Sequence, residues 1–151
     1  ATLYNYFKDA NELVFECVKD FITEIETAVN EEVASSKRGI PKLKAISNAY
    51  VKYYIQYPGI FELFFMEKVT DLGYNNPSIK LVHSVLDSLC ENEWDYCKEK
   101  RIFTPQEIKI KKELLKNALL GTLLFYLNRY APSDYTEFTD LVNKQLSSIL
   151  K

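Results

Sequence analysis

The chain has 151 residues, of which 47% are hydrophobic, 26% charged and 14% aromatic, with only 4 glycines and 5 prolines. This length suits one domain with a sizeable core, and the composition excludes a disordered or low-complexity chain. With 19 basic and 21 acidic residues, the formal net charge is -2. That balance excludes nucleic-acid binding through bulk positive charge.

The longest nearly apolar run, residues 118–127, is about half as long as a membrane-spanning helix requires, so we expect no membrane partner. Cys17, Cys90 and Cys97 lie within helical patterns and lack the spacing of a disulfide framework. Such cysteines are typical of reduced thiols in a cytoplasmic protein. Helical sequence follows directly on Ala1, which is not an initiator methionine, so we expect part of the natural protein to lie upstream.

Hydrophobic spacing is helical along nearly the whole chain, and no segment alternates as a strand would. Residues 2–7 predict the end of a short helix. Asp9 and Glu12 resemble a capping box, from which a long helix should run until the breakers Gly39 and Pro41. Its predicted apolar stripe holds Leu13, Cys17, Phe21, Ile25 and Ala28, widened by Val14, Val18, Ile22 and Val29.

Two aromatic segments come next. A helix over residues 42–57 should end at Pro58 and Gly59, and a short helix after them carries several aromatic side chains. Asn76 followed by Pro77 is typical of an N-cap with proline at the first helical position. We therefore expect another helix from there to about residue 100.

The last third of the chain predicts two helices. Thr104 and Glu107 form a second capping box around Pro105, which begins a long helix. Its first turns are basic, whereas residues 118–127 are apolar all round, which is typical of a helix buried on every side. Pro132 should end this helix, and Ser133 with Asp134 should begin an amphipathic one. The prediction is an all-α bundle of about six to seven helices.

The first thirteen residues, ATLYNYFKDANEL, carry a family signature. They resemble the end of the helix-turn-helix in TetR-family transcriptional repressors, where a small residue precedes T-L-Y-x-Y/H-F, a lysine and a capping residue. Ala10 departs from the family's usual lysine, and Glu12 lies one place past its usual acidic position. The segment Tyr57-Pro58-Gly59, followed by Phe61 and Phe64, is similar to one subgroup of the family's regulatory domains.

The resemblance implies two parts. Residues 1–8 would be the remnant of a DNA-binding domain, and residues 9–151 an all-helical ligand-binding and dimerisation domain. In the recognition helix, Thr2 would contact bases or phosphate, while Tyr4, Tyr6 and Lys8 would contact phosphates. Because two preceding helices are absent here, only the complete protein is expected to bind operator DNA.

Two consecutive helices supply an unusually rich set of aromatic side chains. Aromatic residues at helical spacing are most often plain core, but a largely apolar ligand pocket with hydroxyls at its rim would have the same composition. His83 is either part of such a pocket or an ordinary exposed histidine. The predicted pocket contains Tyr50, Tyr53, Tyr54, Phe61, Phe64, Phe65, His83, Trp94 and Phe125.

The residues indicate no metal, cofactor or catalysis. His83, Cys90 and Cys97 follow one another at seven-residue steps. On a helix that spacing is about 10 Å along the axis, too far for one metal ion with bonds of about 2 Å. No nucleophile and base form a triad, and no glycine-rich phosphate loop is present, so we expect no enzyme. A thiol sensor at Cys90 or Cys97 is a minor alternative.

Small residues recur on the long penultimate helix. Ala118, Gly121 and Thr122 would let a neighbouring helix come close. This spacing fits burial within one subunit, or an isologous four-helix interface between two copies, which the TetR resemblance implies. The predicted interface consists of Ala118, Gly121, Thr122, Phe138, Leu141, Val142 and Leu146.

Together these observations predict a TetR-like transcriptional regulator that acts in the cytoplasm as a homodimer. It would be a repressor released from operator DNA by a small, largely apolar or aromatic effector. The alternative is a helical protein-interaction or lipid-carrying module without a DNA role, in which the first twelve residues match the signature by chance.

Overall fold

The structure, a computed structural model, describes residues 10–66, 77–128 and 131–151. Within these ranges all regular elements are helices and no strand is present, which confirms the predicted all-α class. Thr2, Tyr4, Tyr6 and Lys8 lie outside the described residues. The elements in order are α1 (Ala10–Val33), α2 (Ile40–Gln56), α3 (Pro58–Phe61), the π-helical turn η2 (Glu62–Met66), α4 (Pro77–Glu99), α5 (Pro105–Leu127) and α6 (Tyr135–Ile149).

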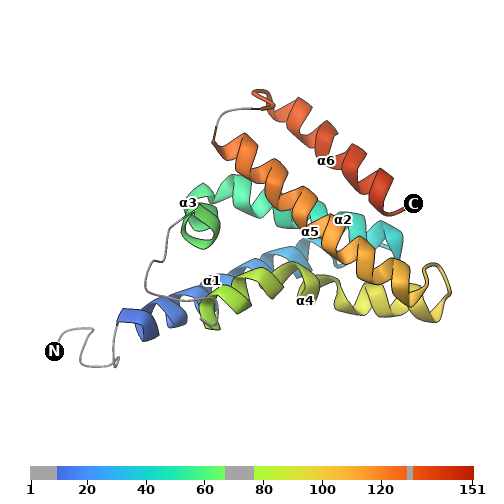
Figure 1. Ribbon diagram of the computed structural model, residues 1–151, viewed down its shortest axis with the longest axis horizontal. Helices are drawn as coiled ribbons and strands as arrows, with labels where there is room; N and C mark the ends of the chain where they lie inside the picture. The colour runs from blue at the N-terminus through green and yellow to red at the C-terminus, as the bar shows by residue number, and fades with distance from the viewer. Residues whose placement is uncertain (1–9, 67–76, 129–130) are drawn as a thin grey trace.

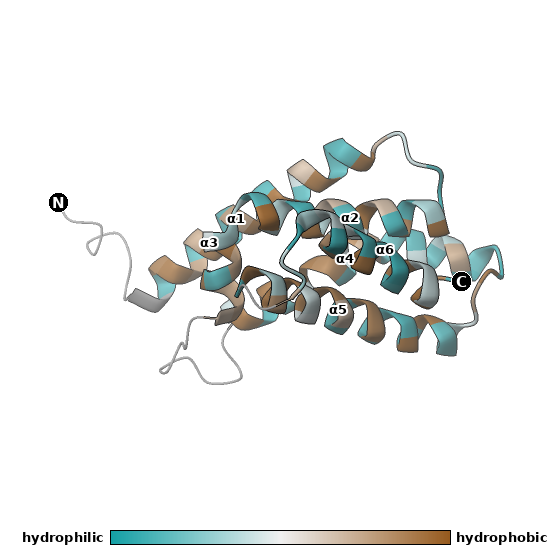
Figure 2. Ribbon diagram, turned by 90° about the horizontal axis from the view of Figure 1, so that it is seen from above, coloured by the Kyte–Doolittle hydropathy of each residue, from teal (hydrophilic) through white to brown (hydrophobic). Residues whose placement is uncertain are grey.

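Helix α2 lies at the centre and packs against α1, α4, α5 and α6. In Figure 1, α1 and α4 run side by side along the lower edge, while α5 crosses in front of α2 with α6 above it. The view from above in Figure 2 places α5 along one outer edge of the molecule, with hydrophobic residues spread over its length. The core is therefore built around α2, and its buried residues are Leu43, Ile46, Ser47, Ala49, Tyr50, Val51, Tyr53 and Tyr54.

Two predicted helix starts are confirmed in atomic detail. The Glu107 amide donates to Thr104 Oγ1 at 3.2 Å, and the Thr104 amide donates to Glu107 Oε2 at 2.7 Å, which completes the capping box of α5. At the start of α6, the Thr136 amide donates to the Asp134 carboxylate at 3.2 Å. Each bond satisfies an amide that has no partner inside its helix.

The buried stripe of α1 differs from the predicted one. Cys17 and Ala28 of the predicted stripe are exposed, whereas its members Val18, Ile25 and Val29 are buried together with Val33. The centre of the buried stripe is therefore rotated towards the residues that were expected only to widen it. Because the whole α1 sequence is rich in apolar residues, periodicity alone did not distinguish two stripes that are rotated by one position.

Pro58 and Gly59 also act differently from the prediction. They do not merely end the preceding helix, since Pro58 is the first residue of α3 and its fixed φ suits that position. Tyr57, between the two helices, is 52% exposed. The aromatic segment that follows is a single α-helical turn joined to the π-helical turn η2.

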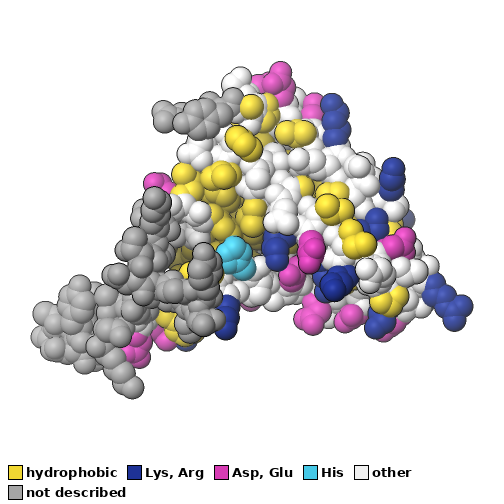
Figure 3. All heavy atoms as spheres, in the orientation of Figure 1, with side chains coloured by type: hydrophobic (Ala, Val, Ile, Leu, Met, Phe, Trp, Pro, Cys, Tyr) yellow, Lys and Arg dark blue, Asp and Glu magenta, His cyan; other side chains and the backbone are white. Residues whose placement is uncertain are grey.

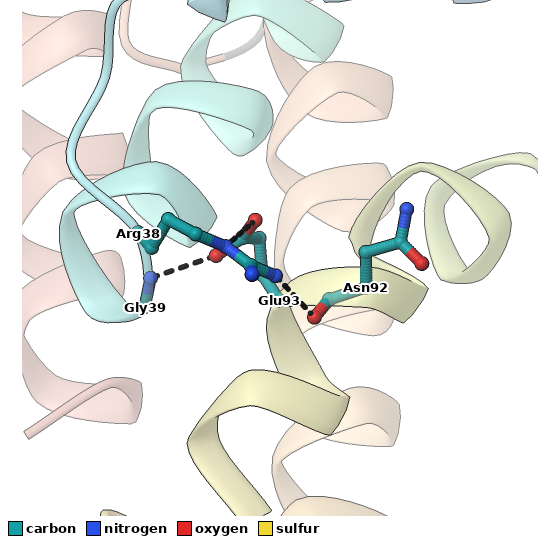
Figure 4. Close-up of polar contacts among 4 residues, drawn as sticks. All are labelled: Arg38, Gly39, Asn92 and Glu93. Atoms are coloured by element: carbon teal, nitrogen blue, oxygen red, sulfur yellow. Dashed lines mark hydrogen bonds and ion pairs between the residues drawn. The ribbon is translucent and has the colours of Figure 1, made fainter. Parts of the chain in front are cut away.

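A polar bracket ties the α1–α2 turn to α4 (Figure 4). The buried carboxylate of Glu93 accepts a hydrogen bond from the Gly39 amide at 2.7 Å and another from Arg38 Nε at 3.2 Å. The guanidinium of Arg38 also donates to the carbonyl of Asn92 at 3.1 Å and lies over the ring of Tyr96, 4.5 Å from its centroid. Glu93 thus holds together two segments that are 54 residues apart in the sequence.

Position 39 of this bracket requires glycine. Its φ of 85° lies in the left-handed region, and a Cβ atom would meet the Tyr96 ring at 3.3 Å. The glycine therefore lets the turn approach α4 closely enough for its amide to reach Glu93.

The bracket predicts an ordered effect of two substitutions on stability. Glu93→Ala should lower the free energy of unfolding by about 1–3 kcal/mol, because the buried Gly39 amide then has no acceptor. Glu93→Gln should cost less, since its amide oxygen can still accept that bond. Urea unfolding followed by circular dichroism measures both values, and an equal loss for the two variants would contradict the role of the Gly39 bond.

Candidate functional site

Six aromatic residues from α2, α3 and η2 form one packed group, the Tyr54 cluster. Tyr54 lies at its centre, 0% exposed, and its ring meets five others edge to face at centroid distances of 5.0–6.4 Å. This geometry is a favourable one for aromatic pairs. The members are Tyr50, Tyr53, Tyr54, Phe61, Phe64 and Phe65, all of which belong to the predicted pocket.

These aromatic rings pack against one another in the core. Tyr50, Tyr54 and Phe61 are at most 1% exposed, whereas Phe64 and Phe65 are partly buried. A cavity of about 50 Å³ adjoins Phe64 and is otherwise lined by side chains of α1, η2 and α4. This volume is far below the 300–1,000 Å³ that is typical of ligand pockets. The cluster as described is closed.

Burial keeps the tyrosines of the cluster protonated. It raises the pKa of Tyr53 to about 12, with the carboxylate of Glu24 adding to the effect. The Tyr53 hydroxyl lies 3.5 Å from Glu24 Oε2, to which it donates. Burial also raises the pKa values of Tyr50 and Tyr54 well above the usual 10.0.

The three remaining residues of the predicted pocket lie outside this cluster. Trp94 is buried beside Phe103, with ring centroids 6.4 Å apart, and Phe125 is 60% exposed on α5. Phe125 therefore lies apart from the cluster on the surface of α5, whereas Trp94 belongs to the same hydrophobic core as the cluster and packs beside Phe103. His83 is exposed, and its ring touches only the edge of the cluster, 6.1 Å from Phe65.

A second candidate site is the outer face of α5 and α6. Figure 3 shows hydrophobic side chains following the diagonal course of α5 across the front of the molecule. Ile110, Leu114 and Phe125 of this row are 49%, 52% and 60% exposed. Their spacings of four and eleven residues place them on one side of the helix.

A groove of about 640 Å³ lies between the second half of α5 and α6, and Phe125 forms part of its wall. At its floor, Thr122 Oγ1 and the side-chain amide of Gln145 are joined by hydrogen bonds of 2.9 and 3.1 Å. Nothing lies within 4 Å of where a Cβ atom at Gly121 would be. The groove is lined by Asn117, Ala118, Gly121, Thr122, Phe125, Ala131, Pro132, Leu141 and Gln145.

Two predictions about these helices are corrected. The second half of α5 is not buried on every side, since Leu124 and Phe125 are exposed. Three residues assigned to the dimer interface, Phe138, Val142 and Leu146, are at most 1% exposed and face the core of their own subunit. The other four, Ala118, Gly121, Thr122 and Leu141, do line the outer groove. Sequence reasoning missed Ile110 and Leu114, although their spacing from Gly121 and Phe125 was a usable signal.

A third hollow, of about 420 Å³, lies between α4 and α5 and is polar. Its walls include four lysines and three carboxylates, and Lys116 lies 3.7 Å from Asp87. Because the charges nearly cancel, this cleft selects neither anions nor cations strongly. The charged residues are Lys98, Lys109, Lys112, Lys116, Asp87, Asp95 and Glu113.

The described residues form no metal centre. No three histidine, cysteine, aspartate or glutamate side chains among them gather closely enough to hold an ion. Cys90 and Cys97 are both buried, and burial raises the pKa of Cys90 to about 12, which keeps its thiol protonated. Cys17 is exposed. None of the described helices has the length and apolar character needed to cross a membrane.

Comparison with known proteins gives no further assignment: no family model, curated protein or solved structure matches this chain.

The raised pKa values predict that the protein loses stability in alkali. In the unfolded chain Cys90 titrates near 9.0 and the tyrosines near 10.0, while in the folded chain these groups keep their protons to higher pH. The unfolded state therefore binds fewer protons above pH 9, so the free energy of unfolding should fall as the pH rises from 9 towards 12. Urea titrations across this range measure the slope, which Tyr54→Phe should reduce. A flat profile would show that the buried hydroxyls ionise normally.

Proposed function

We propose that this protein is a TetR-like transcriptional regulator, a homodimeric repressor that leaves operator DNA when a small, largely apolar or aromatic effector binds. The observation that carries the proposal is the position of the signature: its last residues, from Ala10 to Leu13, form the first turn of α1. A helix of 24 residues is about 36 Å long. Such a helix can transmit a displacement from the core to a DNA-binding segment at its start.

Packing around α1 supports the proposed coupling. The helix lies against both α2 and α4, and Phe21 on α1 contacts Phe64 of η2 with ring centroids 6.3 Å apart. A change in the Tyr54 cluster therefore reaches α1 through direct ring contacts. To release DNA, the effector must bind the state that does not fit the operator more tightly than the state that does. A coupling of about 1–3 kcal/mol would give ~5- to 150-fold derepression.

The exposed face of α5 and α6 supports the proposed homodimer. The exposed apolar side chains of α5, together with a groove whose lining includes Gly121, can accept the same helix pair from a second copy about a two-fold axis. In the dimer, the exposed Ile110, Leu114 and Phe125 would leave water. Two recognition helices would then lie about one turn of DNA apart, ~34–36 Å.

The dimer proposal predicts opposite effects of one substitution on folding and assembly. In the single chain the space beside Gly121 is open, so Gly121→Leu should keep or raise the stability of α5, because glycine is a poor helix former. The added side chain should nevertheless block the partner and give a monomer. Light scattering after size-exclusion chromatography measures the mass.

Two further variants define the face. Phe125→Glu should also give a monomer, whereas Ile102→Glu, at an equally apolar exposed position in the α4–α5 turn, should remain dimeric. A wild-type protein that is monomeric at every concentration would refute the proposed interface.

The regulator proposal is tested with the complete natural protein and the DNA upstream of its gene. We expect a specific mobility shift that Lys8→Ala weakens, with a decrease of about one in the slope of log affinity against log salt. Lys144→Ala, which removes an exposed lysine of α6, should leave this slope unchanged. Binding that is equal for all DNA sequences, or absent, would favour a helical interaction module instead.

A further inference from the structure

The hydroxyl group of Tyr54 is an unusual feature of the core. Its oxygen is buried, and no described residue forms a hydrogen bond with it. Buried polar groups in proteins almost always have such a partner, and each exception calls for an explanation. A tyrosine hydroxyl can both donate and accept. The Tyr50 hydroxyl acts on it electrostatically but does not meet the geometry of a hydrogen bond, so one polar contact at the centre of the cluster remains unused.

Two aromatic side chains separate this tyrosine from the surface. Phe64 lies between Tyr54 and Phe21 of α1, and Phe65 lies between Tyr54 and His83 of α4. Figure 3 shows a hydrophobic patch at the position of α3 and η2, with the single histidine at its edge. Phe64 and Phe65 are both partly exposed, so these two side chains can move outwards without displacing a fully buried residue that lies outside them.

Both phenylalanines belong to η2, a single turn of π-helix. Such turns are rare and occur frequently at functional sites. The apolar cavity of about 50 Å³ beside Phe64 is bordered by Val18, Ile79 and Val82. It gives the Phe64 ring room for a shift, although it is too small to hold a ligand itself.

The electrostatic surroundings favour an uncharged ligand. The carboxylates of Glu24 and Asp87 act on the hydroxyls of Tyr53 and Tyr50, respectively. The cation–π pairs and salt bridges found among the described residues involve no member of the Tyr54 cluster. A negative charge would be repelled there, and a positive one would have to leave water.

We propose that the Tyr54 cluster is a closed ligand site. When no ligand is bound, the rings of Phe64 and Phe65 fill the space that the ligand would occupy. Its occupant is an uncharged, one-ring aromatic compound with a single carbonyl or hydroxyl oxygen. The ligand's ring replaces a phenylalanine ring against Tyr54, and its oxygen forms a hydrogen bond with the Tyr54 hydroxyl. This inference rests on the proposed function, because it names the effector class and the polar anchor of the regulator.

Three compounds of nearly equal shape test the site: acetophenone has a carbonyl acceptor, α-methylstyrene replaces that oxygen with carbon, and benzoate is charged. Titrations of the chain followed by heteronuclear NMR give the dissociation constants. Acetophenone should bind about three- to tenfold more tightly than α-methylstyrene, the net effect of one hydrogen bond. Benzoate should bind most weakly.

Substitution of the anchor separates the hydrogen bond from the shape of the site. Tyr54→Phe should bind acetophenone and α-methylstyrene equally well, whereas Tyr126→Phe, a control at a partly buried tyrosine outside the cluster, should keep the wild-type preference. Because the Tyr54 hydroxyl has no partner in the described structure, Tyr54→Phe should unfold at the same urea concentration as the wild type or a higher one.

Several results would overturn this inference. They are equal binding of acetophenone and α-methylstyrene by the wild type, no binding of any probe, or a Tyr54→Phe variant that unfolds at clearly lower urea concentration. None of these measurements involves DNA. Probe binding with the expected preference, in a protein that recognises no operator, would therefore support the site and refute the regulator.

Discussion

The packing of α2 is the constraint on which the rest of the structure depends. Every other long helix of the described chain contacts it, and eight of its 17 residues are buried. Its buried side chains point in more than one direction, towards α1 and α4 on one side and α5 and α6 on the other. A rotation of α2 would therefore disturb both the Tyr54 cluster and the support of the α5–α6 face. The bracket from Glu93 to Arg38 and Gly39 opposes such a rotation, because it fixes the turn from which α2 starts.

This arrangement separates two surfaces with different physical properties. The Tyr54 cluster is dry, tightly packed and closed by side chains of η2, whereas the groove of α5 and α6 is wide, apolar and open to water. Closed aromatic packing suits a small ligand that replaces one ring by another. An open row of apolar side chains suits a second protein surface, since only a large partner can remove all of it from water. In the proposed regulator these are the effector site and the dimer interface, and α2 lies between them.

Local interactions in the sequence determined the helical class and several helix ends. Thr104 with Glu107, and Asp134 with Thr136, form the expected caps because each cap depends only on residues within three positions of one another. The aromatic composition of two consecutive segments also indicated that they lie together, and six of the nine predicted pocket residues do form one cluster. The predictions for DNA contacts concern residues outside the described ranges and remain predictions.

Only the tertiary structure decided which apolar residues face the core. Along the second half of α5 nearly every position is apolar, so periodicity could not distinguish the buried Leu119 and Leu123 from the exposed Phe125. In α6, Leu141 and Val142 are adjacent and both apolar, so the sequence could not assign Val142 to the core and Leu141 to the surface groove. The role of Glu93 depends on Arg38 and Gly39, which are distant in the sequence. The identity of a hydrophobic residue does not specify which residue it will contact, because the hydrophobic effect is non-directional. Its partner is determined only when helices that are distant in the sequence pack together.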